Sequence, residues 1–104
     1  MNKYSVNLTS QFNKELKDIY EYIYYSLSSP QTANKLYFKI KNSILNLKFF
    51  PESYPKIIFN NSKEHNLRKM IINKYVIIFK VQNVSNEVFI LHIFHGSQNY
   101  IDKL

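Results

Sequence analysis

The sequence predicts an α+β domain in which a helical hairpin packs on one face of a mainly antiparallel sheet, in the order β-α-α-β-β-β. Apolar side chains recur at helical spacing from residue 12 to residue 47, with an interruption at Ser28-Ser29-Pro30. Three apolar, strand-like segments follow at 67–72, 75–82 and 87–95, separated by short polar turns. Helices followed by a run of strands are typical of α+β domains.

Length and composition narrow the class of protein. The 104 residues suffice for one modest core, so we expect a single domain over residues 1–104. The absence of cysteine excludes a disulfide framework and cysteine-based zinc or redox sites, and we expect neither metal nor cofactor. No apolar run is long enough to span a membrane and no signal-peptide pattern opens the chain. We therefore expect a cytoplasmic protein without a membrane partner.

The formal net charge of +7 is concentrated in the middle of the chain. Residues 33–80 hold ten basic side chains, with Glu52 and Glu64 as the only acids. A positive field favours an acidic partner, which is either a nucleic acid or an acidic protein. The composition does not separate these two kinds of partner.

Periodicity and capping residues predict the first strand and helix. Residues 3–8 alternate between polar and apolar side chains, which predicts a half-buried strand. Thr9 or Ser10 then caps the first helix. The apolar stripe of this helix consists of Phe12, Leu16, Ile19, Tyr20, Ile23 and Leu27.

The second helix starts with a serine cap followed by Pro30 at the first helical position. Its apolar stripe consists of Ala33, Leu36, Tyr37, Ile40, Ile44 and Leu47. Pro51 disfavours helical geometry in the residue before it, so the helix should stop near Phe49-Phe50. The polar residues 51–65, which include His65, predict an irregular loop with a solvated histidine.

Turn chemistry predicts the register of the C-terminal strands. Asn73-Lys74 predicts a two-residue turn, and residues 83–86 predict a longer one. The first turn pairs residue 72 with 75, 70 with 77 and 68 with 79, all on the face toward the helices. The opposite face then carries Lys69, Val76, Ile78 and Lys80.

Arg68 is the only arginine among the 14 lysine and arginine residues. Its planar guanidinium can grip a carboxylate or phosphate in a bidentate manner that lysine cannot copy. Because the register places it toward the helices, we expect a structural role. Its partner would be a carboxylate of the first helix, Asp18 or Glu21, or a backbone carbonyl.

Three segments carry a resemblance to a known family. They are Leu47-Lys48-Phe49-Phe50-Pro51, the run from Arg68 to Val81, and Ile93-Phe94-His95-Gly96-Ser97-Gln98-Asn99-Tyr100. With their order and spacing, nearly the whole chain resembles the RelE/ParE superfamily of bacterial type II toxins. The resemblance implies a toxin that arrests growth and is neutralised by a cognate, acidic antitoxin encoded beside it.

The superfamily divides by activity, and the resemblance is nearer to its ParE branch. RelE-like members cut mRNA on the ribosome, whereas ParE-like members are known as inhibitors of DNA gyrase without nuclease activity. RelE-like enzymes place basic residues on the open face of the sheet. One of these basic residues is a lysine on the strand before the turn, and it is matched here by Lys69. Val76 and Gln98 occupy the positions of two arginines of the same set. Gln98 also departs from the arginine often found in ParE-like members.

The two branches imply different roles for the candidate residues. Whether the chain is an enzyme stays open, and enzymatic activity is the less favoured interpretation. A metal-independent ribonuclease would rest on Lys69, His95 and Tyr100. The candidate residues for binding a target are Lys69, Lys80, His95, Gln98, Asn99 and Tyr100. Tyr75, like Arg68, is expected to be structural. A small basic nucleic-acid-binding module is a further alternative.

His92 and His95 lie three residues apart in a predicted strand. An odd offset places two side chains on opposite faces of a sheet. We therefore expect that these histidines form neither one catalytic site nor a metal-binding pair.

Overall fold

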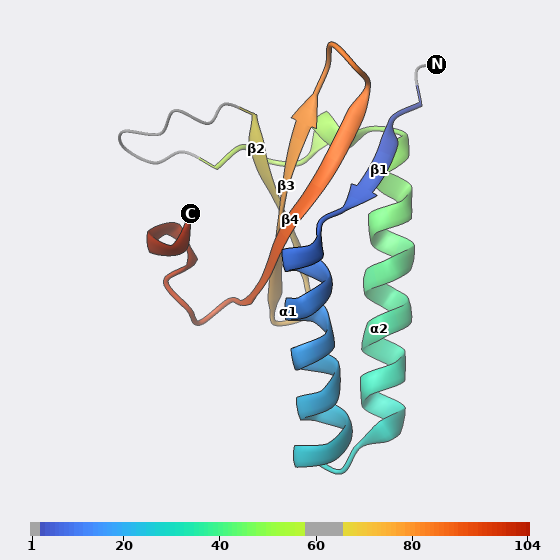
Figure 1. Ribbon diagram of the computed structural model, residues 1–104, viewed down its shortest axis with the longest axis vertical. Coiled ribbons are helices and arrows are strands. Elements are labelled where there is room, and N and C mark those ends of the chain that lie inside the picture. The colour runs from blue at the N-terminus through green and yellow to red at the C-terminus, as the bar shows by residue number, and fades with distance from the viewer. Residues whose placement is uncertain (1–2, 58–65) are drawn as a thin grey trace.

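The computed structural model describes residues 3–57 and 66–104, which form a helical hairpin packed on one face of a four-stranded sheet (Figure 1). The strand order is β1-β4-β3-β2. β2 (Leu67–Ile72), β3 (Tyr75–Gln82) and β4 (Glu87–His95) are antiparallel neighbours, while β1 (Ser5–Leu8) runs parallel to β4. The predicted fold class and element order are confirmed, and the β1–β4 pair makes the sheet mixed.

Thr9 joins the first strand to α1 (Ser10–Glu21). Its hydroxyl accepts a hydrogen bond from the Phe12 N–H at 3.2 Å and donates one to the Ile90 carbonyl at 2.7 Å. The predicted cap is therefore Thr9, and it fixes the start of the helix against β4. Phe12 and Leu16 are buried as their spacing predicts.

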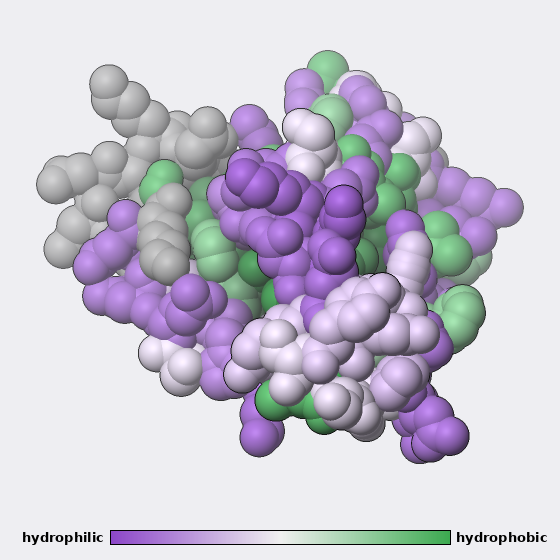
Figure 2. Space-filling model, turned by 60° about the horizontal axis from the view of Figure 1, so that its bottom comes forward, coloured by the Kyte–Doolittle hydropathy of each residue, from purple (hydrophilic) through white to green (hydrophobic). Residues whose placement is uncertain are grey.

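The end of the first helix differs from the prediction that Leu27 belongs to the buried apolar stripe. α1 continues into a π-helical turn, η1 (Tyr22–Ser26), which closes wider hydrogen-bonded rings than an α-helix. The wider turn shifts the phase of the apolar stripe, so Ile23 is the last buried member and Leu27 is exposed. The shift also leaves Tyr22 and Tyr25 exposed. Figure 2 views the molecule from the side of this turn, where surface of intermediate hydropathy is bordered by hydrophilic surface.

The second helix, α2 (Pro30–Leu45), begins at its proline as predicted. Ser29 occupies the cap position, but its hydroxyl bonds the Thr32 hydroxyl at 2.7 Å and no backbone N–H. A 3₁₀ turn, η2 (Asn46–Lys48), ends the helical segment just before Phe49-Phe50. The buried members of the predicted stripe are Ala33, Leu36, Ile40, Ile44 and Leu47, whereas Tyr37 is half-buried.

The predicted strands and their register are confirmed. Ile72 lies opposite Tyr75 and Arg68 lies opposite Phe79, with Asn73 at a φ of 53° in the two-residue turn. The register of the next pair shifts, because Ile78 lies opposite His92 and Phe79 opposite Ile90. Leu91 is therefore an extra residue in β4, as in a β-bulge.

The bulge at Leu91 decides which side chains of β4 meet the core. Val88, Ile90 and Ile93 all belong to the core under the helices, although 90 and 93 are an odd number apart. His92 stacks on Phe94, which belongs to a smaller cluster on the opposite face. His95 instead packs edge-on against Tyr75 at 5.5 Å on the helix side. The prediction that the two histidines lie on opposite faces is confirmed.

Arg68 is buried, with 7% of its surface exposed. Its Nη1 donates to the carbonyl oxygens of Tyr54 at 2.7 Å and Glu52 at 3.1 Å, and its Nε donates to Asn66 Oδ1 at 3.2 Å. Its Nη2 also lies 3.5 Å from a Glu52 carboxylate oxygen. The prediction of a backbone carbonyl partner is confirmed, whereas that of Asp18 or Glu21 is wrong. Arg68 lies on β2 at the edge of the sheet, while α1 packs over β4.

The segment after the hairpin is more ordered than the predicted loop. It begins with a 3₁₀ turn, η3 (Pro51–Ser53). The Ile57 N–H donates to the Leu67 carbonyl at 2.8 Å, and the Lys69 N–H donates to the Pro55 carbonyl at 3.1 Å. This segment therefore covers the outer edge of β2. Residues 58–65, with His65, lie outside the described residues.

We expect Arg68→Lys to lower the free energy of unfolding by about 2–3 kcal/mol, because a buried cation would lose charge-assisted hydrogen bonds. Glu52→Gln should cost less than about 1 kcal/mol, since the Glu52 side chain is 45% exposed and its ion pair is long. Urea unfolding followed by circular dichroism measures both. Equal losses would mean that the ion pair, and not the carbonyl bonds, holds Arg68.

Candidate functional site

The face of the sheet turned away from the helices carries a band of apolar side chains. Val76, Ile78 and Phe94 form a buried cluster there, and Ile57 and Tyr100 pack against it. The resemblance to RelE-like ribonucleases aligns Val76 with one of their arginines. Among the described residues, the three members of this buried cluster carry no charge that could stabilise a reacting phosphate.

Two of the candidate residues, Lys69 and Lys80, lie on the same open face. Lys69 lies opposite Ile78, and Lys80 lies opposite Leu67 on one side and Phe89 on the other. Both lysines are half-buried. They add positive charge beside the apolar band and suit an acidic or mixed surface of a partner.

The remaining candidates come from the C-terminal turn. The Gln98 side chain accepts a hydrogen bond from the His95 N–H at 2.9 Å, and the Asn99 amide donates to Asp102 at 2.8 Å. The ring of Tyr100, which opens η4 (Tyr100–Lys103), stacks on Phe94 at 6.5 Å. These contacts hold the turn against the end of β4.

The structure does not bring Lys69, His95 and Tyr100 to one point. Lys69 and Tyr100 belong to the open face, whereas the His95 ring lies against Tyr75 on the helix side. The His95 Nδ1 is 2.6 Å from the Ser97 hydroxyl. An acid–base pair needs both groups within hydrogen-bonding reach of one substrate, and these residues are separated by the sheet.

Gly96 lets the chain turn close to the β2–β3 hairpin. Its N–H donates to the Lys74 carbonyl at 2.7 Å. A Cβ atom at this position would lie 3.2 Å from the same carbonyl oxygen, which is tighter than most real contacts. Glycine therefore permits the approach that places residues 97–100 beside the sheet.

Glu15 is a contact residue that the sequence did not single out. β1 pairs with β4 only as far as Ile90, so the rest of β4 would present free N–H groups at its edge. A Glu15 carboxylate oxygen accepts from the Ile93 N–H at 3.1 Å, and both its oxygens lie 3.2 Å from His92 Nδ1. No pattern in the neighbouring sequence indicates that a carboxylate on a helix will accept hydrogen bonds from the edge of a distant strand.

Two clefts flank Tyr75 and differ in charge. The cleft between α1 and β4 has a volume of about 570 Å³ and includes the carboxylates of Glu15 and Asp18. The cleft between α2 and the β2–β3 turn has a volume of about 720 Å³ and includes three lysines. These are Lys35, Lys39 and Lys74. Burial, followed by the neighbouring Tyr22, raises the pKa of Tyr75 above its usual 10.0.

Potential metal ligands are not clustered in the part of the chain that the structure describes. Within 3–57 and 66–104, no three histidine or carboxylate side chains are grouped to hold one. In the same part of the chain, none of the helices has the length and apolar character required to cross a bilayer.

Comparison with known proteins identifies the class of this fold. Residues 6–100 match the family described as the ParE toxin of the type II toxin–antitoxin system parDE. The chain therefore belongs to the ParE toxin family. No curated protein sequence matches it in a direct comparison.

Solved structures share the fold at low sequence identity. The chromosomal ParDE system from P. aeruginosa is 21% identical, with a TM-score of 0.69 over 89% of this chain and 96% of that chain. The RelBE2 toxin–antitoxin complex from Mycobacterium tuberculosis is 14% identical, with a TM-score of 0.63 over 94% and 97%. A mutant of the E. coli toxin RelE in the free state is 12% identical, with a TM-score of 0.62 over 97% and 92%.

We expect Glu15→Ala to speed hydrogen exchange of the Ile93 amide by about tenfold, because that N–H loses a bond worth roughly 1.5 kcal/mol. Glu15→Gln is the matched control, since its amide oxygen can still accept the bond. NMR-detected exchange of the two variants measures the difference. Equal protection in both would show that Glu15 does not close the strand edge.

The raised pKa of Tyr75 predicts a loss of stability in alkali. A raised folded-state pKa means that the neutral phenol stabilises the fold below pH 10, and that this contribution fades as pH rises through the folded-state pKa. The free energy of unfolding of wild type should therefore fall more steeply above pH 10 than that of Tyr75→Phe. Tyr25→Phe, an exposed tyrosine of η1, is the control. Identical slopes for wild type and Tyr75→Phe would contradict the assignment.

Proposed function

We propose that this ParE-family toxin arrests growth by binding its target and not by cutting RNA. DNA gyrase is the target that the family resemblance implies. The observation that carries the proposal is the apolar cluster of Val76, Ile78 and Phe94 at the centre of the open face. RNA cleavage without a metal would need a base, an acid and cations around one phosphate.

The surface next to this cluster supports binding to a large partner. Tyr100 and Phe94 form an aromatic stack, with Lys69 and Lys80 on the same face of the sheet. Aromatic anchors bordered by charges are typical of protein interfaces. Gln98 and Asn99 extend this surface at the C-terminal turn and are exposed.

A ribosome-dependent ribonuclease is the second candidate function. It is favoured by Lys69 and Tyr100, which lie on the same open face. The position of His95 on the other side of the sheet counts against it. Both candidate targets are cytoplasmic, and we place the action of the toxin in the cytoplasm.

We further propose that a cognate acidic antitoxin neutralises the chain. Similar folds occur in solved toxin–antitoxin complexes, including RelBE2 from Mycobacterium tuberculosis and ParDE from P. aeruginosa. The formal net charge of +7 favours an acidic partner. Association of oppositely charged proteins is steered by their fields and weakens as salt rises.

Two assays run in parallel separate the two functions. Purified protein should inhibit DNA supercoiling by gyrase and leave ribosome-bound mRNA intact, because the described residues do not bring Lys69, His95 and Tyr100 together on the open face. Lys69→Ala is the diagnostic variant and Lys14→Ala, an exposed lysine on α1, is its control. Codon-specific mRNA cuts that disappear only in Lys69→Ala would refute the binding proposal in favour of the ribonuclease.

A further inference from the structure

The cleft of about 720 Å³ between α2 and the β2–β3 turn is basic, and we call it the basic cleft. Its charged side chains are Lys35 and Lys39 of α2 and Lys74 of the turn, and all of them are exposed. None of the described residues that line it is acidic. The basic cleft therefore presents positive charge to solvent, whereas the cleft on the other side of Tyr75 includes the carboxylates of Glu15 and Asp18.

The two lysines of α2 are placed in a way that costs the helix stability. Lys35 and Lys39 are four residues apart in the helix, so they lie on one face about 6 Å apart along its axis. Like charges at this spacing repel each other. Within the part of the chain that the structure describes, neither lysine forms an ion pair with a carboxylate. An anion that lies between the two ammonium groups would remove this repulsion.

The β2–β3 turn orients one of these cations. Asn73, at a φ of 53°, accepts a hydrogen bond from Lys39 Nζ at 2.8 Å through its Oδ1 atom. The amide is neutral, so it holds the ammonium group without cancelling its charge. An ammonium group has three N–H donors, and this bond leaves the others for an anion. Lys39 is thus a positioned cation, and Lys74 follows Asn73 in the same turn.

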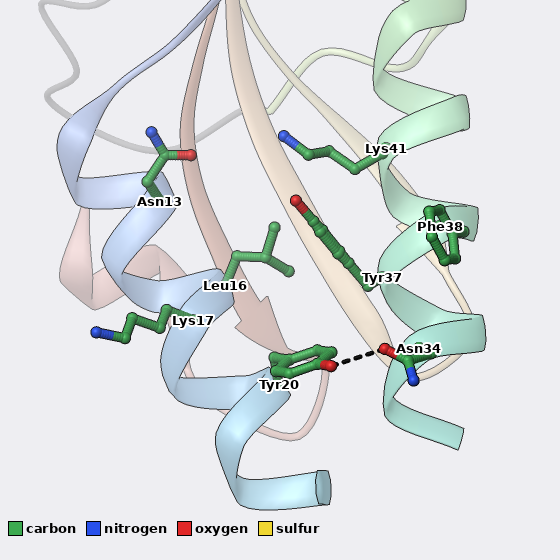
Figure 3. Close-up of a pocket in the computed structure, with 8 residues that line it drawn as sticks. All are labelled: Asn13, Leu16, Lys17, Tyr20, Asn34, Tyr37, Phe38 and Lys41. Atoms are coloured by element: carbon green, nitrogen blue, oxygen red, sulfur yellow. Dashed lines mark hydrogen bonds between the residues drawn. The ribbon is translucent and has the colours of Figure 1, made fainter. Parts of the chain in front are cut away.

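The other flank of α2 has a different character. It faces a groove of about 480 Å³ against α1, where Figure 3 shows Tyr20 beside Asn34 and Tyr37. The Tyr20 hydroxyl donates to Asn34 Oδ1 at 2.7 Å, and Lys41 Nζ lies 5.5 Å from the centre of the Tyr37 ring. These polar groups have partners within the chain. Among the described residues, the lysines of the basic cleft meet neither a carboxylate nor an aromatic ring.

The wall of the basic cleft is apolar, because Ile23, Leu27 and Leu36 line it together with Tyr75. Cations beside an apolar wall fit a chain in which phosphates alternate with sugars, since the phosphates can meet the ammonium groups while the sugars lie against the wall. Deoxyribose suits such a wall better than ribose, because it has no 2′-hydroxyl that would lose its water there. An acidic peptide would instead place unpaired backbone N–H and C=O groups against the same wall.

We propose that the basic cleft binds the phosphate backbone of duplex DNA. Lys35, Lys39 and Lys74 contact phosphate groups, so the contact carries no sequence specificity. The inference deepens the proposed function and rests on it for its setting, because the cleft would touch the DNA that gyrase holds. Binding of DNA by the chain alone is measured without gyrase, so each can fail without the other.

Removal of charge tests the basic cleft. The probe is a short fluorescein-labelled DNA duplex of random sequence, and fluorescence anisotropy gives its Kd for the purified chain at several salt concentrations. A triple variant with Lys35→Gln, Lys39→Gln and Lys74→Gln should raise the Kd about tenfold or more. The slope of log Kd against log salt should fall by about 2 to 3, since each phosphate contact contributes about 0.9.

The control removes the same charge from exposed lysines outside the cleft, through Lys14→Gln, Lys17→Gln and Lys48→Gln in one chain. The two triple variants have equal net charge, so a general attraction between the chain and DNA affects both alike. The control should lower the slope by less than about 1. Circular dichroism confirms that both variants fold, and all the replaced side chains are exposed.

A footprint on the unchanged chain gives a second measurement. Acetylation by N-hydroxysuccinimide acetate, followed by mass spectrometry, reports the reactivity of each lysine. At a duplex concentration about ten times the Kd, acetylation of Lys35, Lys39 and Lys74 should slow about tenfold, because only the free fraction reacts. Lys14 and Lys48 should stay reactive.

Competition tests the chemical class of the ligand. Unlabelled DNA duplex should displace the probe at a lower concentration than an RNA duplex or poly-glutamate of matched charge. If either competitor displaces the probe as well as DNA does, the basic cleft is not a DNA site and the inference is overturned.

The remaining outcomes separate the inference from the proposed function. If both triple variants weaken binding equally, or if acetylation slows alike inside and outside the cleft, the basic cleft is not the site. If the chain inhibits gyrase but does not bind the duplex, the inference fails and the proposed function stands. If the chain binds the duplex through the cleft but does not inhibit gyrase, the proposed function fails and the DNA contact stands.

Discussion

The buried guanidinium of Arg68 connects β2 to the segment that follows the helical hairpin. It donates to two carbonyls of the segment that follows the hairpin and meets the Glu52 carboxylate. Glu52 in turn lies 3.3 Å from the Tyr4 hydroxyl, which also lies 3.1 Å from Asn83 Oδ1 in the β3–β4 turn. Burial and the Glu52 carboxylate raise the pKa of Tyr4, so it stays a neutral donor. Arg68 therefore connects β2 to the segment that follows the hairpin, and Glu52 and Tyr4 extend this network to the start of the chain and to the β3–β4 turn.

The two faces of the sheet carry different kinds of side chain. The helix side holds the main core, and Tyr75 lies at its border between an acidic cleft and a basic one. The open side holds the apolar cluster of Val76, Ile78 and Phe94, and the resemblance to RelE-like ribonucleases aligns Val76 with one of their arginines. Proteins that share a fold commonly differ in chemistry through a few side chains of this kind.

Features that depend on neighbouring residues could be predicted from the sequence. The Thr9 cap, the start at Pro30 and the Asn73-Lys74 turn each follow from local backbone chemistry. The register of β2 and β3 follows from that turn, and it placed Lys69 and Arg68 on their correct faces. The π-helical turn that exposes Leu27 was missed, because a run of helix-compatible residues does not reveal a local change in hydrogen bonding.

By itself, the sequence determined the element order, the register of β2 and β3 and the family, because periodicity, caps and turn residues act over a few positions. Only the tertiary structure decided which groups meet across long separations. It replaced the expected helix partner of Arg68 with Glu52, and it placed Glu15 on the free edge of β4. The bulge at Leu91 also sent His95 to the helix side, away from Lys69 and Tyr100. Such contacts depend on how whole elements pack, and no spacing within the chain encodes them.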